Sequence, residues 1–218
     1  MIQPSRRTRR LVSVAAGALV LCGCAGQPVD VTSPARPQIA ARPGRPGFVV
    51  AAPDGRRDID DMAVEIARRT GFGLVVATGF SRDAEGAYAR RVLEAAQGPL
   101  RFYAEIHGAD RAECTGQIEI ATVGIDRELA LRLRTLAELI RDAHLRTNRE
   151  VQRLDVLIEP ADVVMAGTPG VSRDPILRLP QRALQIELPR CARRDWRETY
   201  TAILADFLAQ AVTLPVGR

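Results

Sequence analysis

The chain contains no lysine and only two histidines, so arginine supplies nearly all of its positive charge. We attribute the absence of lysine to coding bias rather than to function. Several motifs of known chemistry are also missing. There is no glycine-rich phosphate loop of either common pattern, no Gly-x-Ser-x-Gly of serine hydrolases, and no paired cysteine spacing of a zinc motif. Gly71-Phe72-Gly73 is expected to end a helix and begin a strand rather than to bind a dinucleotide.

The N-terminus has the parts of a bacterial secretory signal. Four arginines lie in the first ten residues, and an eleven-residue apolar run from Leu11 to Leu21 follows. That run is too short for a membrane-spanning helix, which takes about 20 residues. Leu21-Cys22-Gly23-Cys24 then resembles the lipobox of bacterial lipoproteins. We therefore expect a signal peptide over residues 1–23 and a lipid on Cys24. An ordinary cleaved signal with an incidental cysteine is the alternative.

Removing the signal changes the charge of the chain. The full chain has a formal net charge of +5, and four of its arginines lie in the signal, so the mature chain is near neutral, at about +1. The basic balance is therefore no evidence for a nucleic-acid partner. We expect a protein of the cell envelope, held to the membrane through its lipid alone and facing the periplasm from the outer membrane.

The segment after Cys24 is rich in Pro, Ala, Gly and Arg, with prolines at 28, 34, 37, 43 and 46. Such a composition buries no core and is typical of an extended, mobile tether. The expected organisation is thus a signal at 1–23, the lipidated cysteine and its tether at 24–46, and one domain at 47–218. No internal repeat is present.

Within the domain, short apolar runs alternate with amphipathic stretches. Six runs predict strands: Phe48–Ala52, Gly73–Ala77, Arg101–Ile106, Gln117–Val123, Leu154–Ile158 and Ala183–Leu188. Most are continuously apolar, as in strands that are covered on both faces. We therefore expect a three-layer α/β domain of the phosphorylase/hydrolase-like type, with a mixed but mainly parallel central sheet and helices on both faces.

Three helices have recognisable ends. Asp60 or Asp61 is expected to cap the first, which should stop at Gly71. Asp126 is expected to cap a long helix with apolar residues at spacings of three and four. Asp195-Trp196-Arg197-Glu198 resembles a capping box at the start of the last helix.

Charged side chains follow the expected strands at their carboxyl ends, where open α/β sheets bind ligands. They are Asp54, Asp58, Arg82, His107, Glu187 and Arg190. Glu187 lies between two apolar residues, and burying an unpaired carboxylate is costly, so it should have a partner such as an arginine or a metal-bound water. An exposed edge strand is the alternative for Glu187, and surface ion pairs are the alternative for both arginines. His144 is expected at the surface.

Four short motifs, in order over most of residues 48–210, resemble the N-formylglutamate amidohydrolases and related zinc exopeptidases. They are Pro53-Asp54-Gly55, Gly79-Phe80-Ser81-Arg82, Glu105-Ile106-His107-Gly108 and the run from Leu184 to Arg190. The resemblance implies one divalent metal, zinc first, held by Asp54, Asp58 and His107, with Asp60 as the other candidate for the acidic ligand. It also implies that Glu187 is the general base and that Arg82 and Arg190 hold a substrate carboxylate.

The implied reaction is hydrolysis of an amide bond in a small carboxylate-bearing acyl-amino acid or peptide. Two departures from the family pattern affect this site. Asp54 stands where the family has histidine, and a site with two carboxylates and one imidazole favours manganese or magnesium-like ions. The family's serine-arginine motif continues to an aspartate, an asparagine and a second arginine, but no asparagine occurs between Arg82 and Arg91. Because both changes spare the scaffold, the alternative is a catalytically inactive binding or scaffold lipoprotein.

Cys114 and Cys191 are the two cysteines outside the signal and anchor. Each follows a strand that should end at the same edge of the sheet, and the envelope is an oxidising compartment. The two either form a disulfide or remain separate thiols.

Overall fold

The computed structural model describes residues 38–78, 85–109, 114, 116–163 and 175–215. Seven strands in these residues form one sheet in the order β1-β3-β2-β4-β7-β5-β6. The strands are β1 (Gln38–Arg42), β2 (Arg45–Ala52), β3 (Phe72–Thr78), β4 (Phe102–Gly108), β5 (Gln117–Val123), β6 (Asp155–Ile158) and β7 (Arg182–Leu188). Only the β1/β3 and β5/β7 pairs are antiparallel. The expectation of a mixed, mainly parallel sheet is confirmed.

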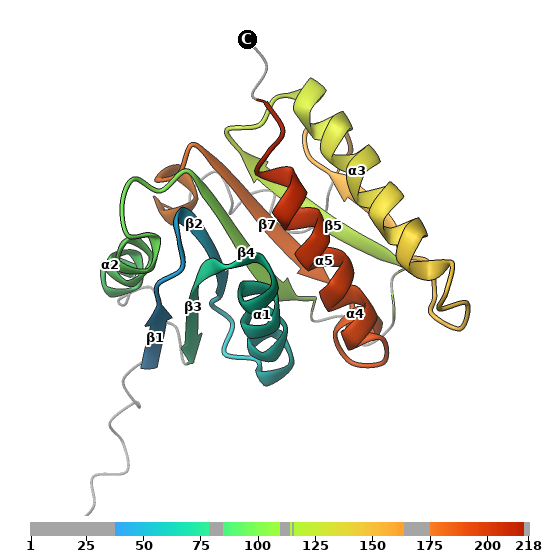
Figure 1. Ribbon diagram of the computed structural model, residues 1–218, viewed down its shortest axis with the longest axis horizontal. Helices are drawn as coiled ribbons and strands as arrows, with labels where there is room; N and C mark the ends of the chain where they lie inside the picture. The colour runs from blue at the N-terminus through green and yellow to red at the C-terminus, as the bar shows by residue number, and fades with distance from the viewer. Residues whose placement is uncertain (1–37, 79–84, 110–113, 115, 164–174, 216–218) are drawn as a thin grey trace, which may run out of the picture. The chain divides into compact units, whose positions relative to one another are not determined.

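Helices cover both faces of this sheet. They are α1 (Arg57–Thr70), α2 (Glu85–Ala96), α3 (Arg127–Leu145), α4 (Arg190–Arg193) and α5 (Arg197–Ala211), with a short 3-10 helix, η2, at Pro175–Arg178. Helices α1, α3, α4 and α5 share one apolar core with the sheet, whereas α2 and η2 share another. Figure 1 shows α1, α5 and α3 side by side over the first face. The three-layer expectation is therefore confirmed as well.

All six strands expected from apolar runs are present, with ends that differ by at most three residues. Their success has a simple cause, because the central strands bury both faces. Val49 and Val50 are adjacent on β2, point to opposite faces and are each 0% exposed. A continuous apolar run is what such a position requires.

The structure corrects the expected tether. Gln38–Arg42 forms β1, which pairs antiparallel with β3 at the sheet edge, so the folded region begins before residue 47. Most of β1 is exposed, and an edge strand is stabilised by backbone hydrogen bonds that leave no mark in side-chain composition. The following Gly44 allows a close approach, because a Cβ there would lie 2.3 Å from the carbonyl carbon of Phe72. Residues 1–37, with Cys24 and the expected signal, lie outside the described residues.

Two expected helix ends are confirmed and two are wrong. The Asp126 carboxylate accepts a hydrogen bond from the Leu129 N–H at 2.8 Å, and Gly71 ends α1 in the left-handed conformation with φ of 73°. However, α1 begins at Arg57, before Asp60 and Asp61, and its N-cap Arg56 makes no side-chain cap. Helix α5 begins after Trp196, also without a side-chain cap, so the capping box at Asp195 does not form.

Cys114 and Cys191 form a disulfide, with their Cα atoms 5.4 Å apart. The bond joins the segment after β4 to α4, so the pairing that the sequence left open occurs. No helix in the described part of the chain is long and apolar enough to span a membrane.

Candidate functional site

The carboxyl ends of β2, β4 and β7 lie side by side at one edge of the sheet, because these three strands are consecutive neighbours and all parallel. Asp54 follows β2, and His107 lies near the end of β4. On β7, Glu187 is in register with His107. Neighbouring residues in register point to the same face of a sheet, so Glu187 and His107 share a face.

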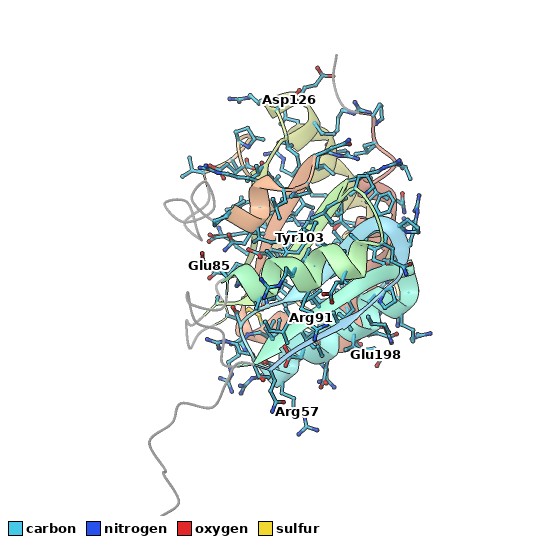
Figure 2. All side chains as sticks on the ribbon, turned by 90° about the vertical axis from the view of Figure 1, so that its left-hand side faces the viewer. Arg57, Glu85, Arg91, Tyr103, Asp126 and Glu198 are labelled. Carbon is cyan, nitrogen blue, oxygen red and sulfur yellow. A yellow bond between two sulfur atoms is a disulfide. The ribbon has the colours of Figure 1, made fainter. Side chains whose placement is uncertain are left out.

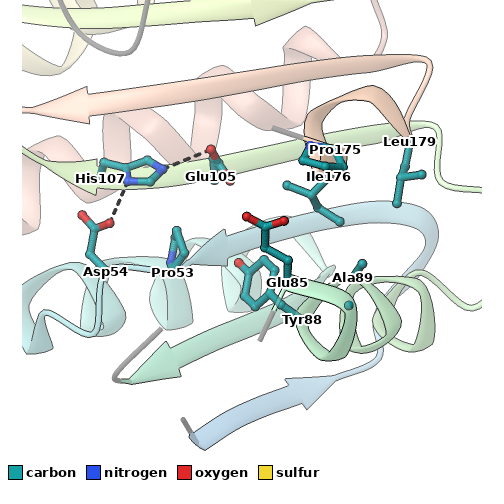
Figure 3. Close-up of a pocket in the computed structure, with 11 residues that line it drawn as sticks. Pro53, Asp54, Glu85, Tyr88, Ala89, Glu105, His107, Pro175, Ile176 and Leu179 are labelled. Carbon is teal, nitrogen blue, oxygen red and sulfur yellow. Dashed lines mark hydrogen bonds and ion pairs between the residues drawn. The ribbon is translucent and has the colours of Figure 1, made fainter. Parts of the chain in front are cut away.

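His107 lies between two carboxylates, as Figure 3 shows. Its Nδ1 is 2.7 Å from Oδ1 of Asp54, and its Nε2 is 3.1 Å from Oε1 of Glu105. The other oxygen of Asp54 accepts a hydrogen bond from the Gly108 N–H at 3.1 Å. We call Asp54, His107 and Glu105 the acidic triad.

The triad is charged. Burial lowers the pKa of His107, but hydrogen bonds and charges from Asp54 and Glu105 outweigh burial and raise this pKa to about 10. For Asp54, burial acts in the other direction and raises the pKa. The contacts with His107 and Gly108 outweigh burial and lower the pKa of Asp54 below its ordinary value. At neutral pH His107 is therefore an imidazolium and Asp54 a carboxylate.

Glu105, which is 3% exposed, connects the triad to buried hydroxyl groups. Tyr103 donates a hydrogen bond to Glu105 at 3.0 Å, and the Tyr103 and Tyr88 hydroxyl groups are 3.2 Å apart. The sequence carries a signal for this role of Glu105. Glu105 precedes His107 by two residues in a strand, a spacing that places both side chains on one face.

The triad opens into a pocket of about 670 Å³ between the sheet, α2 and η2. Three carboxylates line it, those of Asp54, Glu85 and Glu105. Glu85 begins α2, the helix that Figure 2 shows in front of the sheet. The remaining walls are mostly apolar: Pro53, Ala89, Pro175, Ile176 and Leu179, with Tyr88 beside them. A largely apolar pocket with a few convergent polar groups is the usual form of a small-molecule site.

Asp58, the third expected metal ligand, lies apart from the triad. Arg193 Nη1 and Arg194 Nε both donate hydrogen bonds to its Oδ2, the second at 3.2 Å. Burial raises the pKa of Asp58, and these two arginines outweigh burial and lower the pKa below its ordinary value. Asp58 is thus an ionised partner of two arginines.

The expected ligand set does not fit a metal ion. Asp54 and His107 bind each other, and Asp58 is bound to arginine. Among the residues that the structure describes, no group of three or more His, Cys, Asp or Glu side chains is arranged to hold a metal. Asp60, the other candidate, has a buried Oδ1 without a hydrogen-bond partner.

The other expected site residues have different positions. Glu187 is half-buried on β7, and β5 places Glu119 in register beside it. Arg190 is exposed at the start of α4 and does not line the pocket. Arg82 lies outside the described residues. His144 is at the surface, paired with Asp206 at 2.8 Å, so that expectation is confirmed.

Comparison with known proteins gives likenesses of fold at low identity. No protein-family model matches the chain, and no curated protein matches it. A bacteriophage poly-gamma-glutamate hydrolase has 11% identity and a TM-score of 0.47, over 81% of this chain and 88% of that one. An N-acetylmuramoyl-L-alanine amidase from Clostridium difficile 630 has 13% identity and a TM-score of 0.42, over 77% and 95%.

A metallo-carboxypeptidase from Burkholderia cenocepacia has 9% identity and a TM-score of 0.38, over 80% of this chain and 60% of that one. At such identities and TM-scores we draw no functional conclusion from these three proteins. The chain itself is a three-layer α/β domain with a charged triad at the carboxyl edge of its sheet.

Proposed function

We propose that the domain hydrolyses an amide bond in a small molecule that binds in the pocket beside His107. The observation that carries the proposal is the acidic triad itself. Asp54, His107 and Glu105 converge at the carboxyl edge of the sheet and line one pocket. Ionisable groups with strongly shifted pKa values in a pocket are a frequent mark of a catalytic site.

In this proposal, Glu187 removes a proton from a water molecule as the water oxygen attacks the amide carbonyl carbon. The C–N bond then breaks, and the proton passes to the departing amine. We assign this role to Glu187 because it lies in register with His107 on the same face of the sheet, next to the residues that line the pocket rather than among them. General bases of this kind contribute about 10²–10⁴-fold to rates.

His107 supplies a fixed positive charge beside the carbonyl oxygen. Its Nε2 is buried and lies 3.1 Å from Oε1 of Glu105. A fixed positive charge stabilises an oxygen on which negative charge develops. With a pKa of about 10, His107 keeps its proton throughout. No step of the proposed reaction involves a metal ion, because the expected ligands do not fit one.

We also propose a place and a substrate class. The proposed place is the cell envelope, supported by the resemblance of Leu21-Cys22-Gly23-Cys24 to a lipobox, and the proposed substrate is an acyl-amino acid or short peptide with a free carboxylate. A lipid anchor limits the substrates to molecules found outside the cytoplasm.

The test is a hydrolysis assay of the purified protein with a panel of N-acyl amino acids and short peptides. We expect turnover that falls by about 10²-fold or more in Glu187→Gln and in His107→Gln. The matched controls are Glu94→Gln, whose side chain is 57% exposed on α2, and His144→Gln at the surface. Equal activity in the site variants and the controls would refute the proposal.

A second candidate is a binding lipoprotein that has lost turnover. The specific observation in its favour is that two expected metal ligands are neutralised by neighbours, Asp54 by His107 and Asp58 by Arg193. Asp54→His separates the two candidates. If that variant gains a stoichiometric metal ion and activity that the parent lacks, the natural protein is a binding protein.

A further inference from the structure

A second cavity, of about 540 Å³, lies where the start of α1 meets α4 and the start of α5. We call it the arginine cleft. Two aspartates line it, Asp58 and Asp61, together with five arginines: Arg56, Arg57, Arg193, Arg194 and Arg197. Five positive charges against two negative ones leave the lining with a net charge of +3. The residues come from three separate segments of the chain, so the fold gathers the charge.

The two aspartates fix the arginines without neutralising them. Asp58 binds both Arg193 and Arg194, and Asp61 binds Arg197 at 3.0 Å. Three guanidinium groups are therefore held by two carboxylates. Each guanidinium has five N–H donors, and most of those on Arg194 and Arg197, whose side chains are 56% and 49% exposed, are left for a ligand.

Arg193 is the buried arginine of the cleft. It is 4% exposed, and besides Asp58 it donates to the Ala109 carbonyl oxygen at 3.2 Å. Its Nε is buried without a hydrogen-bond partner in the described part of the chain. A buried guanidinium that keeps an unused donor is costly, and a bound ion is one of the groups that can satisfy such a donor.

The start of α1 adds to the positive potential. Arg56 is the N-cap and makes no side-chain cap, and Arg57 is the first helical residue. The side chain of Arg57 projects from the surface, as Figure 2 shows. The N-terminus of a helix carries a partial positive charge, which disfavours cations and attracts anions. Asp58 and Asp60 in the first turn of α1 offset part of this positive charge.

The cleft and the acidic triad meet at Gly108. The Gly108 N–H binds Asp54 of the triad, while a Cβ on this glycine would lie 3.1 Å from Arg193 Nε and 3.2 Å from Arg56 Cδ. One backbone position thus contacts the triad and the cleft, and a side chain there would press against Arg193 and Arg56.

We propose that the arginine cleft binds the anionic group, a carboxylate or a phosphate, of the molecule that enters the pocket beside His107. In this proposal Arg57, Arg194 and Arg197 take the role that the sequence suggested for Arg190, which does not line the pocket. Arg82 lies outside the described residues. Planar guanidinium groups bind carboxylate and phosphate through paired hydrogen bonds. The statement that the cleft ligand and the pocket substrate are one molecule rests on the proposed function; anion binding by the cleft does not.

The experiment is calorimetric titration of the purified full-length protein with inorganic pyrophosphate and, separately, with glutarate, which distinguishes phosphate from carboxylate. The test variant is the double substitution Arg57→Gln and Arg194→Gln. The control is Arg68→Gln with Arg153→Gln, which removes the same charge from arginines that are 66% and 56% exposed away from the cleft. We expect the Kd of at least one anion to rise about tenfold or more in the test variant and no more than about twofold in the control.

Equal changes in the two double variants, or no binding of either anion at millimolar concentration, would overturn the proposal. Hydrolysis assays on the same proteins separate it from the proposed function. If anions bind in the cleft but no amide is hydrolysed, the proposed function fails and the cleft stands. If amides are hydrolysed with a KM that the test variant leaves unchanged, the role of the cleft in substrate binding fails alone.

Discussion

Asp54 Oδ1 and His107 Nδ1 lie 2.7 Å apart, so two residues that family resemblance assigns to one metal ion bind each other instead. A metal ligand must give up its proton, and histidine binds metals as the neutral imidazole. The two carboxylates around His107 favour the opposite state, the imidazolium. Asp54, which stands where the resembled family has histidine, therefore gives the site a different chemistry, because a carboxylate stabilises the charged form of its neighbour.

Asp58→Asn tests whether Asp58 is an arginine partner. The substitution removes the carboxylate that Arg193 and Arg194 share, and Arg193 has a side chain only 5% exposed. Removing one partner of a buried ion pair costs about 3 kcal/mol. We expect the free energy of unfolding, measured with urea, to fall by about that amount, and the metal content of the purified protein to stay the same. Loss of a bound metal without loss of stability would show that Asp58 is a ligand.

Asp60→Asn should stabilise the protein near neutral pH. Burial, followed by repulsion from Asp61, Asp54 and Asp58, raises the pKa of Asp60 to about 6. A carboxyl group with a raised pKa favours folding while it is protonated, and this contribution is lost as pH rises from about 4 through 6. Since Asp60 is partly exposed, we expect a gain of about 1 kcal/mol for the variant at pH 8.

At pH 4, where the parent carboxyl is protonated in the folded state, the Asp60→Asn gain should vanish. Urea unfolding of both proteins at the two pH values checks this. A gain of the same size at pH 4 and pH 8 would mean that charge is not the cause.

Removal of the disulfide should destabilise the domain. Cys114 and Cys191 are 77 residues apart in sequence, and a cross-link over such a loop contributes about 2–4 kcal/mol. We expect the double substitution Cys114→Ala and Cys191→Ala to lower the free energy of unfolding by about this amount. Dithiothreitol should have the same effect on the parent protein and none on the double variant. A parent protein indifferent to the reductant would contradict the bond.

The sequence predicts much of the scaffold. Central strands such as β2 are continuously apolar because both of their faces are buried, and Asp126 caps α3 through a local interaction with Leu129. Signals of this kind depend on residues close together in the chain. The sequence predicts the pairing of Cys114 with Cys191 as one of two possibilities, because strands of a parallel sheet end at a common edge.

Other features depend on contacts between residues that are distant in the sequence, and no local sequence pattern predicts them. Arg193 lies 135 positions from Asp58, and nothing near Asp58 shows that an arginine will bind it. The edge strand β1 is held by backbone hydrogen bonds to β3, which its proline-rich surroundings conceal. Motifs therefore indicated the right edge of the sheet for the site, but not which side chains there would bind one another.

The most direct test of the account is the protonation state of His107. The chain has only two histidines, so a ¹⁵N NMR titration of the His144→Gln variant reports on His107 alone. The account predicts an imidazolium with both nitrogens protonated and a pKa of about 10. The contribution of the His107 imidazolium to the free energy of unfolding is then complete below the ordinary histidine pKa of about 6.5, and it is lost as pH rises through 10. A neutral imidazole at pH 7.5, whether free or bound to a metal ion, would contradict the account.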